Sequence, residues 1–217
     1  MYTRYTLLLI NVLMTGPGLG RNQSMLGRIS IVIDKCKANN IPIVIDADGL
    51  WHLTNNPNVI KGYKKAVLTP NAMEFSRLVH SVLKRGAVPP TVHPDPQVVL
   101  EVSQALGGVT IVHKGSFDMI SNGEFTEKCN EDGCPRRCGG QGDLLSGSLS
   151  VFLYWASRLS KCPDPGAGVI AGWASSRLSR ACAAQAFTQH GRATTTSDLI
   201  DQIESAFSRL YESETCL

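Results

Sequence analysis

The sequence lacks long basic tracts, apolar runs of membrane-spanning length and internal repeats. Its 21 basic and 18 acidic residues leave a formal net charge of +3, and no run of basic residues is longer than a pair. A nucleic-acid surface needs a denser positive patch, and a membrane helix needs about 20 consecutive apolar residues. We therefore expect neither a nucleic-acid nor a membrane partner. With 217 residues, 43% of them hydrophobic, the chain is long enough for a single domain over residues 1–217.

Cysteine and histidine are present without metal-binding spacing. The chain has seven cysteines, an odd number that favours reduced thiols in a reducing compartment. Cys129, Cys134 and Cys138 lie close in sequence but form no CxxC pair, so we do not expect structural zinc. The five histidines show no ligand pairing either. The N-terminal stretch MYTRYTLLLINVLM runs into a glycine loop, which favours a buried strand over a targeting segment.

Hydrophobic periodicity predicts alternating strands and helices along the chain. A proline-rich connection occupies residues 85–96, and Asn122-Gly123 marks the turn of a hairpin. Ser197 stands where the last helix would have its N-cap. The pattern indicates an α/β fold with a mostly parallel sheet flanked by helices. The predicted strands are 5–14, 41–46, 65–70 and 109–115; the predicted helices are 23–38, 49–55, 71–84, 97–106, 143–158, 166–190 and 197–212.

The unusual loops of the chain follow the predicted strands. In parallel sheets, ligands bind at the carboxyl ends of the strands. Loops of atypical composition begin after residues 14, 46, 69 and 113, and a later glycine loop, RRCGGQGD, leads into a helix. We expect these five segments to converge on one crevice.

The glycine loop has the features of an anion site next to a carboxylate. Glycines allow backbone amides to approach a phosphate closely, and a helix N-terminus supplies free N–H groups. Asp143 directly follows Gly142. A carboxylate beside phosphates repels them, so it does not help binding alone. Its place there is explained if it accepts a proton from a hydroxyl that attacks the terminal phosphate. On spacing alone, an equally good interpretation is that Asp143 caps the helix and the glycines form a turn.

Four other segments carry candidate side chains, each with a plain structural alternative. Lys114, at a strand end in HKGSFD, could contact phosphate or be solvated. Asp46 and Asp48 could hold magnesium or a polar ligand, or could cap a helix and form a turn. Asn71 and Glu74 share a face at the start of a helix, which could be an ordinary helix entry. The loop TGPGLGRN lacks the GxGxxG spacing of a Rossmann motif.

Taken in order, GPGLGR, VIDADGL, LTPNAMEF, HKG…D and GGQGDLLSG closely resemble the ATP-dependent NAD(P)H-hydrate dehydratase family. The resemblance runs from about residue 15 to HGRATTTSDLI at 190–200. It implies a ribokinase-like fold. It also implies a repair reaction, in which ATP phosphorylates the ring hydroxyl of the S epimer of NADHX or NADPHX. Phosphate then leaves, and NADH or NADPH, ADP and phosphate are the products.

The resemblance also implies roles for particular residues. Asp143 would be the catalytic base and would contact the hydrate. Magnesium is expected with the nucleotide, although no residue is identified as its ligand. The residues implied to bind the hydrate are Gly18, Asn71, Ala72, Met73, Glu74, Phe75, Ser76 and Arg77. The residues implied to bind ATP are Lys114, Gly115, Ser116, Phe117, Asp118, Gly133, Cys134, Pro135, Arg136, Arg137, Cys138, Gly139, Gly140, Gln141 and Gly142.

The chain departs from the family at its start. Family domains carry further strands ahead of GPGLGR, so we expect a sheet without its leading strands and with an exposed edge. Two alternatives to the dehydratase remain: a ribokinase-like kinase for another small molecule, and a truncated, non-catalytic nucleotide-binding protein. The resemblance is compatible with a cytoplasmic or mitochondrial location and with a homo-oligomer.

Overall fold

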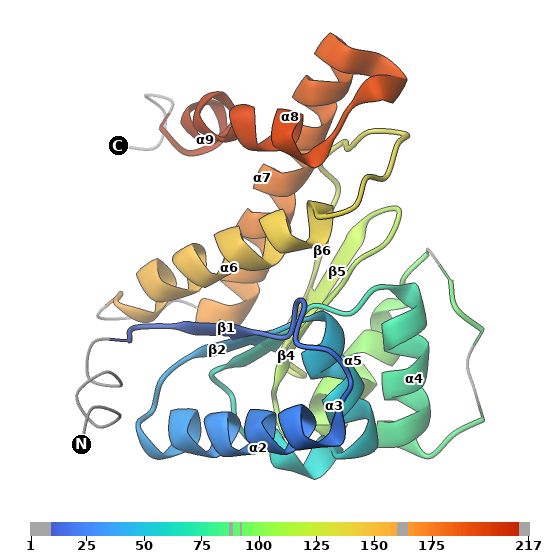
Figure 1. The fold of residues 1–217 in the computed structure, drawn as a ribbon, viewed down its shortest axis with the longest axis vertical. Coiled ribbons are helices and arrows are strands. Elements are labelled where there is room, and N and C mark those ends of the chain that lie inside the picture. Colours follow the sequence, from blue (N-terminus) through green and yellow to red (C-terminus); the bar gives the residue numbers. More distant parts are fainter. Residues whose placement is uncertain (1–9, 87–88, 92, 160–164, 213–217) are drawn as a thin grey trace.

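The computed structural model describes residues 10–86, 89–91, 93–159 and 165–212 (Figure 1). Within these residues, six strands form one sheet in sequence order. The first four are parallel, whereas β4–β5 and β5–β6 are antiparallel pairs, as the predicted hairpin requires. The strands are β1 (Leu13–Thr15), β2 (Ile43–Ile45), β3 (Ala66–Leu68), β4 (Thr110–His113), β5 (Asp118–Ser121) and β6 (Thr126–Cys129).

Helices cover both faces of the sheet, so the predicted architecture is confirmed. Figure 1 shows α2 to α5 on one side and α6 and α7 on the other, with α8 and α9 packed against the far end of α7. In the described part of the chain, two short 3-10 turns, at Pro57–Val59 and Gly191–Ala193, join consecutive elements. The helices are α2 (Gln23–Ala38), α3 (Ala47–Asn55), α4 (Ala72–Leu83), α5 (Pro96–Ala105), α6 (Gln141–Ser157), α7 (Ala167–His190), α8 (Thr196–Asp201) and α9 (Ile203–Tyr211).

The strands are apolar on both faces because each face carries helices. Ile43 and Ile45 pack among the residues of α2 to α5, whereas Val44 between them packs with residues of α6 and α7. All three are fully buried. On α7, a Cβ added at Gly172 would lie 2.8 Å from a methyl carbon of Val112, so this glycine lets α7 pack directly on β4. The central strands are thus fixed firmly, and their carboxyl ends form a rigid base for the loops that follow.

Helix ends differ from the sequence prediction at several positions. The predicted helix 197–212 is two helices, α8 and α9, and its N-cap is Thr195 instead of Ser197. Thr195 and Asp198 form a capping box, which fixes this start. The helix predicted from residue 143 begins two residues earlier, at Gln141, after Gly140 in a left-handed conformation (φ 85°). The predicted strand 5–14 begins outside the described residues.

No helix in the described ranges combines the length and the apolar character that crossing a membrane would require.

Candidate active site

A pocket of about 650 Å³ opens where the predicted loops meet. Its walls come from the segments that follow β3, β4 and β6, from the first turn of α6 and from the middle of α7. It therefore lies at the carboxyl ends of the parallel strands, as expected for this sheet. The predicted site residues that line it are Asn71, Ala72, Lys114, Gly115, Ser116, Asp118, Gly133, Cys134, Arg136, Arg137, Cys138, Gln141 and Gly142.

The remaining predicted residues do not line this pocket, and the sequence missed three that do: Leu145, Ser179 and Arg180. The last two lie on α7, which carries no motif of the kind that marks a ligand site. The predicted residues outside the lining are Gly18, Met73, Glu74, Phe75, Ser76, Arg77, Phe117, Pro135, Gly139, Gly140 and Asp143.

A buried ion pair lies between the strand ends of the sheet and the first turn of α6. Lys114 Nζ donates to Asp46 Oδ1 at 3.0 Å, and the two side chains are 18% and 4% exposed. A Cβ placed on Gly142 would lie 3.6 Å from Lys114 Nζ and 3.8 Å from Asp46 Oδ2, so the first turn of α6 lies directly over the pair. Lys114 thus brings a cation within reach of any anion that binds at the start of α6.

The start of α6 provides backbone donors. The N–H groups of Asp143 and Leu144 both donate to the Gly140 carbonyl, whereas the first amides of a helix, those of Gln141 and Gly142, have no intrahelical acceptor. The preceding loop is tied to the α7–α8 connection. Arg136 Nε donates to the Thr194 carbonyl at 2.8 Å, and the Thr196 hydroxyl donates to the Gly139 carbonyl. The free amides and the Lys114 ammonium lie at one corner of the pocket, an arrangement that is chemically suited to an anion; we call it the anion-binding corner.

Arg180 holds the loop after β4 in place. Its Nη2 and Nε donate to the two carboxylate oxygens of Asp118 at 2.8 and 3.1 Å. Its Nη2 also donates to the Gly115 carbonyl, and its Nη1 donates to the Ser116 carbonyl, both at 2.9 Å. Asp118 in turn accepts from the Gly115 amide at 3.1 Å. Arg180 on α7 therefore holds the KGSFD segment in its conformation. No local sequence pattern indicates these contacts between α7 and the segment.

Asp143 occupies the third position of α6 and is exposed. Its carboxylate has no hydrogen bond or ion pair with any described residue. It lies at a second, apolar groove of about 450 Å³ formed with Leu144, Phe152, Trp155 and residues of α8 and α9. The N-cap of α6 is Gly140, so the interpretation of Asp143 as a helix cap is wrong. Its predicted role as a base stays a prediction.

The remaining carboxylates of the candidate segments serve local structure. Asp46 caps α3 through the Ala47 amide, and Asp48 accepts from the Gly20 amide at 2.9 Å. Glu74 and Asn71 form a capping box at the start of α4. Burial raises the pKa of Glu74, against the opposing effect of the Asn71 amide. Within the described ranges, no three His, Cys, Asp or Glu side chains come together as metal ligands.

His113, one residue before Lys114, is buried and stacked on Phe75, with ring centroids 4.1 Å apart. Neither ring nitrogen has a partner in the described structure. Burial lowers the pKa of His113 to about 4, although Asp118 opposes this shift. The imidazole is therefore neutral near pH 7, and it joins β4 to the NAMEF helix as a packing group.

This neutral histidine predicts a pH-dependent stability. In the unfolded chain histidine titrates near pH ~6.5, so between that pH and about 4 only the unfolded state binds the proton. The free energy of unfolding should fall by up to about 3 kcal/mol as the pH drops through this window, and should not change through this group above it. Urea unfolding of wild type and His113→Leu at several pH values checks this. If the two proteins differ in free energy of unfolding by the same amount at pH ~4 and pH ~7, the prediction is contradicted.

Several proteins that are similar to this chain in sequence carry the same description. A family profile described as NAD(P)H-hydrate dehydratase matches residues 3–205. Curated proteins named ATP-dependent (S)-NAD(P)H-hydrate dehydratase from Pongo abelii, Homo sapiens and Danio rerio are 48%, 47% and 43% identical to it. Each match covers 94% of this chain, and 61%, 58% and 62% of the respective relative. The chain thus spans about three-fifths of the length of these relatives.

Solved structures support the fold. A ribokinase-like superfamily protein of Enterococcus faecalis matches with a TM-score of 0.71 and 21% identity, over 95% of this chain and 68% of that one. A hydroxyethylthiazole kinase of Pyrococcus horikoshii matches with a TM-score of 0.68 and 15% identity, over 95% and 77%. At these identities the likeness concerns the fold alone, which is ribokinase-like as the motifs implied.

Proposed function

The chain belongs to the NAD(P)H-hydrate dehydratase family, and on that premise we propose that it dehydrates the S epimers of hydrated NADH and NADPH at the expense of ATP. The observation that carries this proposal is the anion-binding corner of Lys114 and the α6 amides, in a pocket at the strand ends. The proposal covers NADHX, NADPHX and ATP as substrates.

In the proposed reaction, the ring hydroxyl attacks the terminal phosphorus of ATP and the bond to the ADP oxygen breaks. Asp143 takes the hydroxyl proton, while Lys114 and the amides of Gln141 and Gly142 stabilise the charge on the transferring group. The carbon–oxygen bond then breaks, its electron pair leaves with phosphate, and the neighbouring ring carbon loses a proton. Phosphorylation is needed because hydroxide is a poor leaving group and phosphate a good one.

We propose that magnesium enters this site only together with the nucleotide. The Asp118 carboxylate, which lines the pocket, forms an ion pair with Arg180. The Asp46 carboxylate, which lies beneath the first turn of α6, forms an ion pair with Lys114. Mg²⁺ commonly keeps several waters and binds through substrate phosphates with few protein carboxylates. We therefore propose that the ion accompanies ATP, and that Lys114 and the α6 amides bind the phosphate oxygens that it leaves free.

Incubating the protein with (S)-NADHX, ATP and magnesium tests this function. We expect recovery of the dihydropyridine absorbance, with one ADP and one phosphate formed per hydrate. A stable phosphorylated product would indicate a small-molecule kinase instead. Calorimetric binding of ATP by folded protein without any turnover would indicate a non-catalytic nucleotide-binding protein.

A further inference from the structure

The hydroxyl of Ser179 is buried at the wall of the pocket without a hydrogen-bond partner. Ser179 lies on α7, lines the pocket and is only 4% exposed. Its side chain makes no hydrogen bond with any described residue. A buried hydroxyl without a partner costs free energy, so most buried polar groups in proteins are satisfied. An unsatisfied hydroxyl at the wall of a pocket is explained if a bound ligand supplies the partner.

Other serines of the two neighbouring helices satisfy their hydroxyls within their own helix. On α7, Ser175 donates to the Gly172 carbonyl at 3.1 Å, and on α6, Ser150 donates to the Ser146 carbonyl at 2.9 Å. Such a bond to a carbonyl three or four residues back is the common arrangement for a helical serine. Ser179 lacks it although its backbone is equally helical. Its hydroxyl therefore stays available to the contents of the pocket.

The wall of the pocket formed by α6 and α7 carries no free charge. Leu145, which lines the pocket from α6, is apolar and 5% exposed. Arg180, the residue after Ser179, uses its guanidinium for four hydrogen bonds, to Asp118 and to two carbonyls of the KGSFD loop. This wall thus offers a ligand an apolar surface and one hydroxyl.

The groups suited to phosphate lie on other segments. Lys114 follows β4, and Arg136 and Arg137 belong to the loop that leads into the anion-binding corner. The pocket therefore has a cationic part and an uncharged part. This division suits a nucleotide, whose phosphates are charged and whose base is an uncharged, flat ring with polar atoms at its edge. A volume of about 650 Å³ is large enough for such a ligand.

We propose that the Ser179 hydroxyl binds the edge of the adenine base of ATP, while the phosphates lie at the anion-binding corner. The proposal rests on the proposed function, because it concerns the nucleotide of that reaction. A serine hydroxyl both donates and accepts, so it can pair with the amino group or with a ring nitrogen of adenine. Leu145, on the same wall, offers the apolar surface that the face of the base requires.

Calorimetric binding of nucleotides to wild type and Ser179→Ala tests the assignment without turnover. We expect the Kd for ADP to rise about fivefold, the usual result of losing one neutral hydrogen bond. UDP shares the ribose and both phosphates with ADP but has no purine, so its affinity should be the same in the two proteins. An equal rise for ADP and UDP would place the hydroxyl on ribose or phosphate and overturn the inference, as would an unchanged Kd for ADP.

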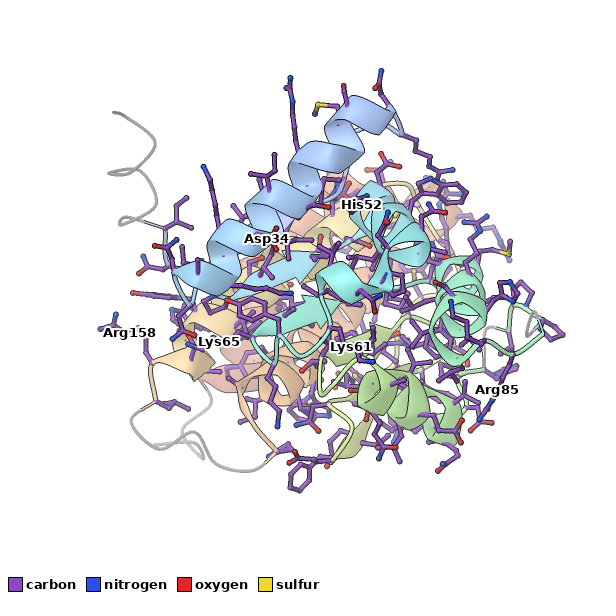
Figure 2. All side chains as sticks on the ribbon, turned by 90° about the horizontal axis from the view of Figure 1, so that it is seen from below. Asp34, His52, Lys61, Lys65, Arg85 and Arg158 are labelled. Carbon is purple, nitrogen blue, oxygen red and sulfur yellow. The ribbon has the colours of Figure 1, made fainter. Side chains whose placement is uncertain are left out.

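Ser175→Ala is the matched control. It removes the same group one turn earlier on α7, from a residue that does not line the pocket. The Kd for ADP should stay at the wild-type value, and a rise equal to that of Ser179→Ala would overturn the inference. Figure 2 shows Arg85 and Arg158, both exposed, at opposite edges of the molecule. ADP that bound only at such surface arginines would respond to neither serine change, which also overturns the inference.

The stability of the ligand-free protein separates a ligand contact from a structural role. Because the Ser179 hydroxyl has no partner to lose, Ser179→Ala should not lower the urea midpoint of unfolding. Ser176→Ala is the comparison, since the Ser176 hydroxyl also lacks a partner but is enclosed and does not line the pocket. It should change neither the midpoint downward nor the Kd for ADP. A lower midpoint for Ser179→Ala, together with weaker ADP binding, would show that the hydroxyl supports the fold and would overturn the inference.

Turnover of (S)-NADHX is measured separately, so that the two proposals can fail independently. If Ser179→Ala weakens ADP binding as expected but wild type does not turn over the hydrate, the proposed function is contradicted and the adenine contact is supported. If wild type turns over the hydrate and both proteins bind ADP equally, the adenine contact is contradicted and the proposed function is supported. Absence of ADP binding by folded wild type overturns the inference.

Discussion

Asp143→Asn is expected to lower the turnover of (S)-NADHX by about 10²- to 10⁴-fold, the usual contribution of a positioned base. Asparagine keeps the size of the side chain but cannot accept the hydroxyl proton. Because the Asp143 carboxylate is exposed and has no partner among the described residues, the melting temperature should stay close to that of wild type. ATP affinity, measured by calorimetry, should not fall, since the amides and Lys114 are untouched.

Asp201→Asn provides the control for this result. Asp201 is an exposed aspartate at the end of α8, outside both the pocket and the apolar groove. Its change should leave turnover unaltered. If Asp143→Asn kept wild-type turnover, the assignment of the base would be wrong. Asp46, the carboxylate beneath Gly142, would then be the next candidate.

Arg180→Met is expected to lower the free energy of unfolding by about 3 kcal/mol or more, the usual result of leaving one member of a buried ion pair without its partner. Arg180 and Asp118 are only 13% and 6% exposed, and the guanidinium also binds two carbonyls of the KGSFD loop. Urea unfolding measures the loss. Under conditions where the variant is folded, ATP binding should also weaken, because Gly115 and Ser116 line the pocket.

Arg177→Met, one turn earlier on α7, is the comparison. Arg177 pairs with Glu131 at 3.1 Å, and the two side chains are 27% and 20% exposed. Solvent screens this pair more, so its loss should cost about 1 kcal/mol or less. If both variants lost the same free energy of unfolding, the contacts of Arg180 would stabilise the protein no more than those of Arg177, and the prediction would be wrong.

The sequence predicted residues that line the pocket where each signal is local. Gly142 precedes a helix and Lys114 ends a strand, and both properties can be predicted from neighbouring residues. The parallel strand order then brings both residues to one edge of the sheet. There, a Cβ on Gly142 would lie 3.6 Å from Lys114 Nζ. Glycine loops, strand ends and fold class were therefore within reach of sequence reasoning.

Contacts between distant segments were not within reach. Arg180 and Asp118 are 62 residues apart, and nothing around Arg180 distinguishes it from any other helix arginine. The division between α8 and α9 was missed for a related reason: the apolar periodicity of 197–212 continues through the break at Gln202. The direction of the Asp143 side chain depends on where α6 begins, and the predicted start was two residues late.

The fate of the hydroxyl oxygen tests the central claim most directly. (S)-NADHX prepared in water enriched in heavy oxygen carries the label in its ring hydroxyl. If ATP phosphorylates that hydroxyl, as proposed, the labelled oxygen leaves with the phosphate, and mass spectrometry should find one heavy oxygen in each phosphate formed. Label released into water, with unlabelled phosphate formed at the same rate, would contradict phosphoryl transfer to the ring alcohol.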